Sequence, residues 1–248
     1  HSKLTLITKK GPQGYSYITQ IGTGNYNEKT SELYTDYSFI TADLGIGEEA
    51  SNVFQNLAVQ KLTETTEKML VAPLRFKSVL LDEMDRVINA ARLGRPASMI
   101  LKNNSISDRD IILKLEEASC AGVRIDMIVR GICCLIPGQE YSHNIRVTRI
   151  VDTFLEHARV WYFGNGGAPK LFLGSPDWMR RNLYRRIEAV TPILDPDLKQ
   201  ELIDMLSIQL SDKRKACFVD DRLRNRWKSS RPQKEKVRSQ YSLSLIHI

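Results

Sequence analysis

The sequence HARVWYF at residues 157–163 decides the fold, because it repeats a pattern that begins the chain as HSKLTLI at residues 1–7. In both segments a histidine is followed two positions later by a cation, and an alternating strand pattern comes next. Each strand leads through a turn to a return strand and a Gly-Thr/Ser-x-Asn/Asp segment, as in IGTGNYN at 21–27 and LGSPDWM at 173–179. The repeat predicts two half-sites that face each other across one cleft.

The histidine and the cation of each copy are expected to act together. Side chains at positions i and i+2 of a strand point to the same face, so His1 pairs with Lys3, and His157 with Arg159. A lysine without a partner is disfavoured in a core, which favours a cleft. Two imidazoles and two cations are what phosphoryl transfer through a phosphohistidine requires. These four residues are the candidate catalytic groups.

The segments after the return strands add candidate phosphate contacts. Glycines let backbone N–H groups approach an anion closely, and hydroxyl groups donate to it. The candidates are Thr23, Asn25 and Ser175. Ordinary turn chemistry is the alternative for either segment taken alone.

The composition is that of a soluble globular protein. The 248 residues are 42% hydrophobic and 26% charged, enough for one large domain or two small ones. No apolar run is long enough to span a bilayer, so we expect a cytoplasmic protein, with peripheral membrane association as an alternative. The chain starts without a methionine, directly on a candidate catalytic residue, and is interpreted as a fragment.

The charge favours a polyanionic partner. The net charge is +7 and the pI about 9.2, which fits nucleotide, polyphosphate, nucleic acid or an anionic membrane face. Solvated lysines are the alternative. Eight cations lie between Arg222 and Arg238, and residues 241–248 show no clear period and receive no function. The four cysteines lack metal-ligand spacing and are expected to be buried free thiols.

Hydrophobic patterning predicts a mixed α/β fold. Strands are expected from Leu4 and at 15–21, 37–41, 97–101, 123–129, 145–150 and 186–190, and helices at 48–62, 78–93, 107–122 and 196–211. The first helix is predicted to turn Val53, Phe54, Leu57 and Ala58 inward, and Ser78 and Ser107 to cap the next two. Alternating strands and helices with hairpins imply mixed β-sheets flanked by helices.

The repeated layout resembles the phospholipase D superfamily. That superfamily carries His-x-Lys, an acidic residue and a Gly-Ser-x-Asn type segment twice per active site. The second copy here departs from the pattern, with Arg159 in place of lysine, and neither copy has the acidic residue shortly after the cation.

A longer resemblance covers nearly the whole chain. The stretches that carry it are IGTGNYNEKT at 21–30, LYTD at 33–36, VRGICCLIPG at 129–138, IVDTFLEH at 150–157, DWMRRNL at 177–183 and RRIE at 185–188. They are similar to the C-terminal half of type 1 polyphosphate kinases. The resemblance implies a truncated first phospholipase D-like domain at 1–70, a second at 71–221 and a basic tail at 222–248. It also implies that further N-terminal domains precede this sequence.

The resemblance assigns roles to single residues. It implies that His1 becomes phosphorylated, that Tyr34 and Arg130 contact the nucleotide, and that His157 is a second active-site histidine that also binds nucleotide. Magnesium is the implied cofactor, with its ligands upstream of His1 and none in this sequence. The implied partners are ATP or ADP and inorganic polyphosphate, in a homo-oligomer and without nucleic acid.

Two other functions stay open at this point. The first is a phospholipase D-like phosphodiesterase or transferase on the same double fold. The second is a non-catalytic polyanion-binding fragment. From the residues alone, Tyr34 could fill a core and Arg130 could be a solvated arginine at a strand end.

Overall fold

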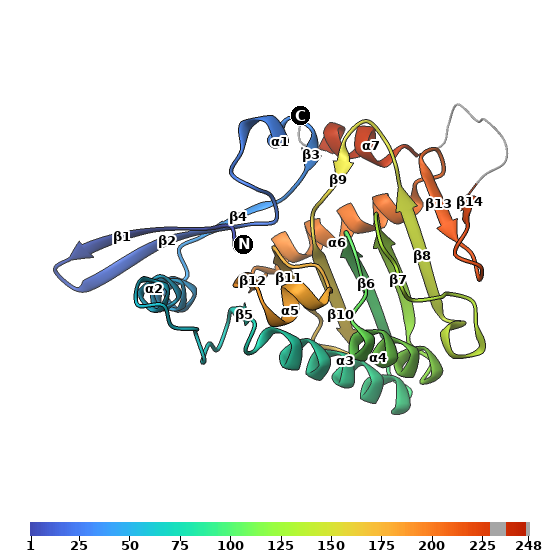
Figure 1. The fold of residues 1–248 in the computed structure, drawn as a ribbon, viewed down its shortest axis with the longest axis horizontal. Coiled ribbons are helices and arrows are strands. Elements are labelled where there is room, and N and C mark those ends of the chain that lie inside the picture. The colour runs from blue at the N-terminus through green and yellow to red at the C-terminus, as the bar shows by residue number, and fades with distance from the viewer. Residues whose placement is uncertain (229–236, 247–248) are drawn as a thin grey trace.

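The computed structural model describes residues 1–228 and 237–246 and is built around one large mixed sheet (Figure 1). Its nine strands follow the order β14-β13-β8-β7-β6-β10-β11-β12-β5. Their bounds are β5 Leu70–Ala72, β6 Ala97–Asn103, β7 Arg124–Val129, β8 Ile145–Ile150, β10 Val160–Asn165, β11 Lys170–Gly174, β12 Glu188–Pro192, β13 Ala216–Val219 and β14 Asn225–Trp227. The strands β6, β7 and β8 pair in parallel, and the other pairs are antiparallel. The predicted mixed α/β class is confirmed.

Helices cover both faces of this sheet. They are α3 Phe76–Arg92, α4 Arg109–Cys120, α5 Arg180–Tyr184, α6 Pro196–Ser211 and α7 Ser239–Ile246, with a 3₁₀ turn at Glu140–Ser142. On the α3 side, Phe76 packs in one core with Trp161 and Phe163 of β10. On the α6 side, Leu206 packs with Val160 of the same strand. Alternate residues of β10 therefore serve the two cores, which is why the strand reads as a nearly continuous apolar run.

The first histidine lies just before a smaller sheet of three antiparallel strands. These are β1 Leu4–Gly11, β2 Gly14–Gly22 and β4 Ser38–Thr41, followed by the helix α2 Leu44–Ala58. Figure 1 shows the β1–β2 hairpin extending away from the large sheet. A short parallel pair, β3 Tyr34–Thr35 with β9 Leu155–Glu156, joins the segments that precede Asp36 and His157. A one-turn helix, α1 Glu28–Ser31, precedes β3.

Three predictions about helix starts were wrong. The helix α2 begins at Leu44 because the Asp43 side chain accepts a hydrogen bond from the backbone of Ile46 at 2.9 Å. Its buried face includes Val53, as predicted. Phe54 is 41% exposed, and Leu57 and Ala58, which were also predicted to point inward, are exposed too. The inward face is the stripe Ile46, Gly47, Ala50 and Val53, which recurs every three to four residues, and Phe54 lies about 100° away from Val53 around the helix.

The predicted caps of the next two helices also differ. The helix α3 begins before Ser78, whose hydroxyl donates to the carbonyl of Arg75. The helix α4 is capped by Asp108 and not by Ser107, because the Asp108 carboxylate accepts from the backbone of Ile111 at 3.2 Å. An aspartate and a serine in sequence offer equivalent caps, so the pattern alone does not choose between them.

The predicted basic tail begins inside the fold. The strand β14 completes the large sheet, and Arg224 and Arg226 both pair with Asp220 at 3.0 Å. Arg238 pairs with Asp152, and residues 239–246 form α7, a helix that was not predicted from the sequence. The predicted cations at 231, 234 and 236 lie outside the described residues.

The cysteines and the helices test two further expectations. All four cysteines are free, as predicted, but only Cys133 and Cys217 are buried, whereas Cys120 and Cys134 are exposed. Within residues 1–228 and 237–246, no helix has the length and apolar character needed to cross a bilayer.

Candidate active site

The first histidine contacts a carboxylate from the far end of the chain. The Nδ1 atom of His1 lies 3.1 Å from Oε2 of Glu188, which is fully buried at the start of β12. Glu188 also accepts from the hydroxyl of Ser175 at 2.5 Å and from the amide of Asn182 at 2.7 Å. The Lys3 ammonium lies 3.0 and 3.2 Å from the two ring nitrogens of His1. The predicted His1–Lys3 pair is thus formed, with a carboxylate fixing the ring from the other side.

The second histidine has the same arrangement. The Nδ1 atom of His157 lies 2.8 Å from Oδ2 of Asp36, and the hydroxyl of Thr23 donates to Asp36 at 2.6 Å. The Arg159 guanidinium lies 3.2 Å from Nε2 of His157. Arg159 itself is buried and donates to Asp177 at 3.0 Å. The carboxylate of Asp177 therefore holds the cation, and that of Asp36 holds the imidazole.

The two half-sites are crossed. Thr23 precedes Asp36 by 13 residues, and Ser175 precedes Glu188 by the same 13 residues. In each copy the hydroxyl binds the carboxylate of its own copy. The carboxylate then contacts the histidine of the other copy. Each histidine thus depends on residues from the opposite half of the chain.

Backbone hydrogen bonds repeat the crossing. The amide of Ser2, which follows His1, donates to the carbonyl of Ile187 at 3.0 Å. The amide of Ala158, which follows His157, donates to the carbonyl of Thr35, also at 3.0 Å. The acceptors stand directly before the two carboxylate residues. Main-chain and side-chain hydrogen bonds therefore both hold the crossed arrangement of the two half-sites.

One arginine joins the halves directly. Arg159 donates to the backbone carbonyl of Thr23 at 3.2 Å, so the cation of the second copy contacts the return strand of the first. The predicted meeting of the two half-sites at one place is confirmed by this contact and by the two crossed carboxylates.

Among the cations of the site, Lys3 has the most clearly shifted pKa. Burial lowers the pKa of Lys3 to about 8. The charges of Arg159 and Arg186 act in the same direction as burial, Glu188 and Asp36 oppose the shift, and the pKa of about 8 is the net result. Such a lysine carries its charge at neutral pH but loses it within a pH range in which enzymes are assayed.

The residues predicted to contact nucleotide lie beside the second histidine. The ring of Tyr34 is half-buried, with its centroid 4.9 Å from that of His157, so Tyr34 does not fill a core. Arg130 follows β7, and its Nε donates to the side chain of Asn104 at 3.2 Å. Asn104 in turn donates to the carbonyl of His157 at 3.2 Å. Among residues 1–228 and 237–246, the terminal nitrogens of Arg130 have no hydrogen-bond partner, and its contact with nucleotide stays a prediction.

The three predicted phosphate contacts differ in exposure. The hydroxyls of Thr23 and Ser175 are buried and donate to carboxylates, so in this structure they support the histidines. Asn25 is exposed and lines a hollow of about 240 Å³ together with Tyr34 and Asp36. Their contact with phosphate stays a prediction.

Sequence reasoning missed the carboxylates. Asp36 and Glu188 appeared only inside family stretches, and Asp177 only in a turn segment and at the start of another family stretch. The equal spacing of 13 residues from hydroxyl to carboxylate extends the repeat and was visible in the sequence. Searching the repeat beyond its return strands would have found both residues.

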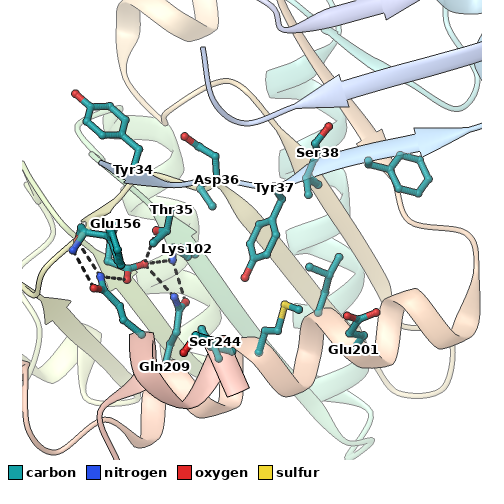
Figure 2. Close-up of a pocket in the computed structure, with 18 of the residues that line it drawn as sticks. Tyr34, Thr35, Asp36, Tyr37, Ser38, Lys102, Glu156, Glu201, Gln209 and Ser244 are labelled. Carbon is teal, nitrogen blue, oxygen red and sulfur yellow. Dashed lines mark hydrogen bonds and ion pairs between the residues drawn. The ribbon is translucent and has the colours of Figure 1, made fainter. Parts of the chain in front are cut away.

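A cavity of about 510 Å³ lies next to the site, between residues 34–39 and the helices α6 and α7. Figure 2 shows Tyr37 pointing into it from the segment that also carries Asp36. At one end, the buried Lys102 pairs with Glu156, which also accepts from Gln209 at 2.9 Å. Burial and the nearby Glu156 raise the pKa of Tyr37, which keeps its hydroxyl protonated.

The described residues do not form a metal cage. Among residues 1–228 and 237–246, no three His, Cys, Asp or Glu side chains are grouped so that they could hold a metal ion. The carboxylates of Asp36, Asp177 and Glu188 are already engaged by imidazoles, a guanidinium and hydroxyls.

Comparison with known proteins places this geometry in a family. Residues 1–63 match the family model described as polyphosphate kinase C-terminal domain 1, and residues 69–240 match that of polyphosphate kinase C-terminal domain 2. Polyphosphate kinases of Vibrio vulnificus strain YJ016 and Escherichia coli strain K12 are 42% and 43% identical over 244 residues, which are 98% of this chain. The chain spans 35% of the length of these relatives.

A solved structure agrees in fold. The crystal structure of polyphosphate kinase from Porphyromonas gingivalis superposes with a TM-score of 0.94 at 41% identity, covering 100% of this chain and 38% of that one. The half-sites described above therefore lie in a fold shared over the full chain. The chain belongs to the polyphosphate kinase family and corresponds to the C-terminal region of a type 1 enzyme.

Proposed function

We propose that this chain is the catalytic C-terminal part of an enzyme that reversibly transfers the terminal phosphate of ATP to inorganic polyphosphate through a phosphohistidine at His1. The observation that supports this most is the contact between His1 Nδ1 and the buried Glu188. A carboxylate at Nδ1 favours the tautomer with the proton on that nitrogen. The Nε2 lone pair can then act as the nucleophile once the Lys3 ammonium, 3.2 Å away, turns from Nε2 to the phosphate oxygens of the substrate.

The proposed reaction has two steps. Nε2 of His1 attacks the γ-phosphorus of ATP, the P–N bond forms, the bond to the β-phosphate oxygen breaks, and ADP leaves. A terminal oxygen of polyphosphate then attacks the same phosphorus, and the P–N bond breaks. The Lys3 ammonium, 3.2 Å from Nε2, is placed to stabilise the equatorial oxygens in both steps.

The second half-site would hold the nucleotide and its departing charge. Asp36 fixes the ring of His157 at Nδ1, so Nε2 and the neighbouring Arg159 guanidinium would lie together on the side of a phosphate oxygen. Arg130 offers a planar fork suited to two phosphate oxygens. Tyr34 offers an aromatic face beside His157.

Magnesium fits this proposal as a partner of the substrate. Mg²⁺ is usually bound through one or two carboxylates together with substrate phosphates and waters. The carboxylates described here are engaged, so the ion would enter on the phosphates of ATP and neutralise part of their charge. The steps above are carried by the side chains of this chain.

One experiment separates the proposal from its rivals. The full-length enzyme is incubated with polyphosphate and ADP, and ATP formation is measured. A kinase makes ATP, whereas a phosphodiesterase on the same fold releases products without making it. A non-catalytic polyanion-binding fragment binds polyphosphate with a steep dependence on salt and makes no ATP.

A further inference from the structure

The start of α7 contacts the segment that leads into His157. The side chain of Gln240 accepts from the backbone amide of Phe154 at 2.9 Å and donates to the carbonyl of the same residue at 2.8 Å. It also donates to Oε1 of Glu156, at 2.8 Å. Gln240 and Glu156 are buried, so these bonds lie away from solvent. One amide side chain therefore binds both residues that flank Leu155 in the strand before the histidine.

The neighbours of Gln240 fix α7 in place. Arg238 donates to both carboxylate oxygens of Asp152, at 2.8 Å from Nε and 2.5 Å from a terminal nitrogen. The amide and hydroxyl of Ser239 both donate to Asp212 at the end of α6, each at 2.8 Å. The helix is thus attached to α6 on one side and to the loop before β9 on the other.

The opposite edge of the same segment belongs to the active site. The amide of Leu155 donates to the carbonyl of Leu33 at 2.8 Å, and β9 pairs with β3 in parallel. The strand β3 carries Tyr34 and leads directly to Asp36, the partner of His157. Figure 1 shows β9 between β3 and α7. The strand before His157 is therefore held from both edges, by β3 and by Gln240.

We propose that Gln240 is a positioning residue for His157: α7 acts as a clamp that holds residues 152–156 so that the imidazole meets Asp36 and the substrate phosphates. This inference rests on the proposed function of His157. Gln240 contacts neither the histidine nor the cations around it. Misplacing a catalytic group by about 1 Å can cost about 10²-fold in rate, so a small shift of β9 is sufficient to matter.

The test compares variants of the full-length enzyme. Gln240→Ala removes all three hydrogen bonds. Gln139→Ala is the matched control, because that amide donates to the carbonyl of Asp221 and caps the 3₁₀ turn at Glu140–Ser142, on another part of the surface. Val219→Ala, in β13, controls for lost stability. Polyphosphate synthesis is measured well below the unfolding temperature, and amide hydrogen exchange is followed in peptides covering residues 152–158.

We expect Gln240→Ala to lower kcat at least about tenfold and to speed exchange of the Phe154 amide by about fivefold or more. Both controls should leave kcat and this exchange near the wild-type values. A second variant tests the chemistry of the contact. Gln240→Glu keeps the size of the side chain but places a second carboxylate against that of Glu156, so it should be as impaired as Gln240→Ala.

The outcomes are distinct. Unchanged kcat in Gln240→Ala, or an equal loss in Val219→Ala, would overturn the clamp. So would a wild-type kcat in Gln240→Glu. If the wild-type enzyme makes no polyphosphate while Gln240→Ala still exposes residues 152–158, the proposed function fails, and with it the role of the clamp in catalysis, but the contact itself is upheld.

Discussion

The imidazole of His157 and the carboxylate of Asp36 meet across 121 residues of sequence, with Nδ1 2.8 Å from Oδ2. The reciprocal pair, His1 with Glu188, spans 187 residues. Each pair takes its histidine from one copy of the repeat and its carboxylate from the other. Neither copy therefore contains a complete histidine site, and the two halves must fold together before either imidazole is oriented.

The carboxylate at His1 gives the first prediction. Glu188→Gln keeps the size of the side chain but loses the charge that stabilises the Nδ1–H tautomer. We expect the rate of His1 phosphorylation to fall by roughly ten- to a hundredfold, comparable with the loss of a carboxylate that orients a ligating histidine. Asp36→Asn is the matched variant and should slow turnover through His157 while His1 is still labelled. Wild-type labelling in Glu188→Gln would remove this carboxylate from the mechanism.

The lowered pKa of Lys3 predicts a pH dependence. The pKa of Lys3 is about 8 in the folded protein, so the ammonium is present below that pH and lost above it. The value of kcat/KM, which reports the free enzyme, should therefore fall as pH rises through about 8. Lys3→Arg keeps its charge to much higher pH and should remove the decline. A decline at the same pH in both proteins would assign the titration to another group.

Arg130 should matter through the shape of its guanidinium. Arg130→Lys keeps the charge but loses both the planar fork and the contact from Nε to Asn104. We expect turnover of the full-length enzyme to fall at least about tenfold, or roughly 1.4 kcal/mol of barrier. Steady-state kinetics with ATP would show this, and Arg124→Lys, at the other end of β7, is the control. An unchanged rate would place Arg130 outside the site.

Two arginines of the predicted basic tail should contribute differently to the free energy of unfolding, although they carry the same charge. Arg238 pairs with the buried carboxylate of Asp152, whereas Arg222 is exposed. Arg238→Gln should lower the free energy of unfolding by about 1–3 kcal/mol, because a buried acceptor loses its partner. Arg222→Gln should change it by less than about 0.5 kcal/mol. Chemical denaturation of both variants would measure this.

The protonation of Asp152 determines how the effect of Arg238→Gln on the free energy of unfolding depends on pH. Burial raises the pKa of its carboxyl, but the hydrogen bond and charge of Arg238 outweigh this and lower it. The stabilisation is thus present above the unfolded pKa of about 4 and is lost as pH falls through the lower, folded value. The difference between wild type and Arg238→Gln should shrink in acid. An equal, salt-dependent loss of polyphosphate binding in both variants, with stability unchanged, would instead support a polymer-binding tail.

The sequence predicted the parts of the site that follow a local pattern. His1, Lys3, His157 and Arg159 were found because a strand places alternate residues on one face, and the repeat doubled the signal. Most strands of the large sheet followed from apolar runs separated by turns, but β5, β13 and β14 were not predicted. These features depend on short-range periodicity, which a single sequence displays.

The crossed carboxylates and α7 could not be predicted in the same way. Which histidine Glu188 contacts depends on how two distant copies pack, and nothing in the residues around Glu188 encodes that choice. Gln240 binds the backbone amide and carbonyl of Phe154 at the edge of β9, and this edge exists only in the folded chain. The start of α2 was misplaced because Asp43 outweighed the apolar periodicity on which the prediction rested.

The central claim is that His1, and not the geometrically similar His157, carries the phosphate. The direct measurement is to incubate the full-length enzyme with γ-labelled ATP and magnesium and to map the acid-labile, base-stable label by peptide. The account predicts label on His1, none in His1→Ala, and labelling slowed by roughly 10²–10⁴-fold but still on His1 in His157→Ala. Label on His157, or normal labelling of His1→Ala, would contradict it.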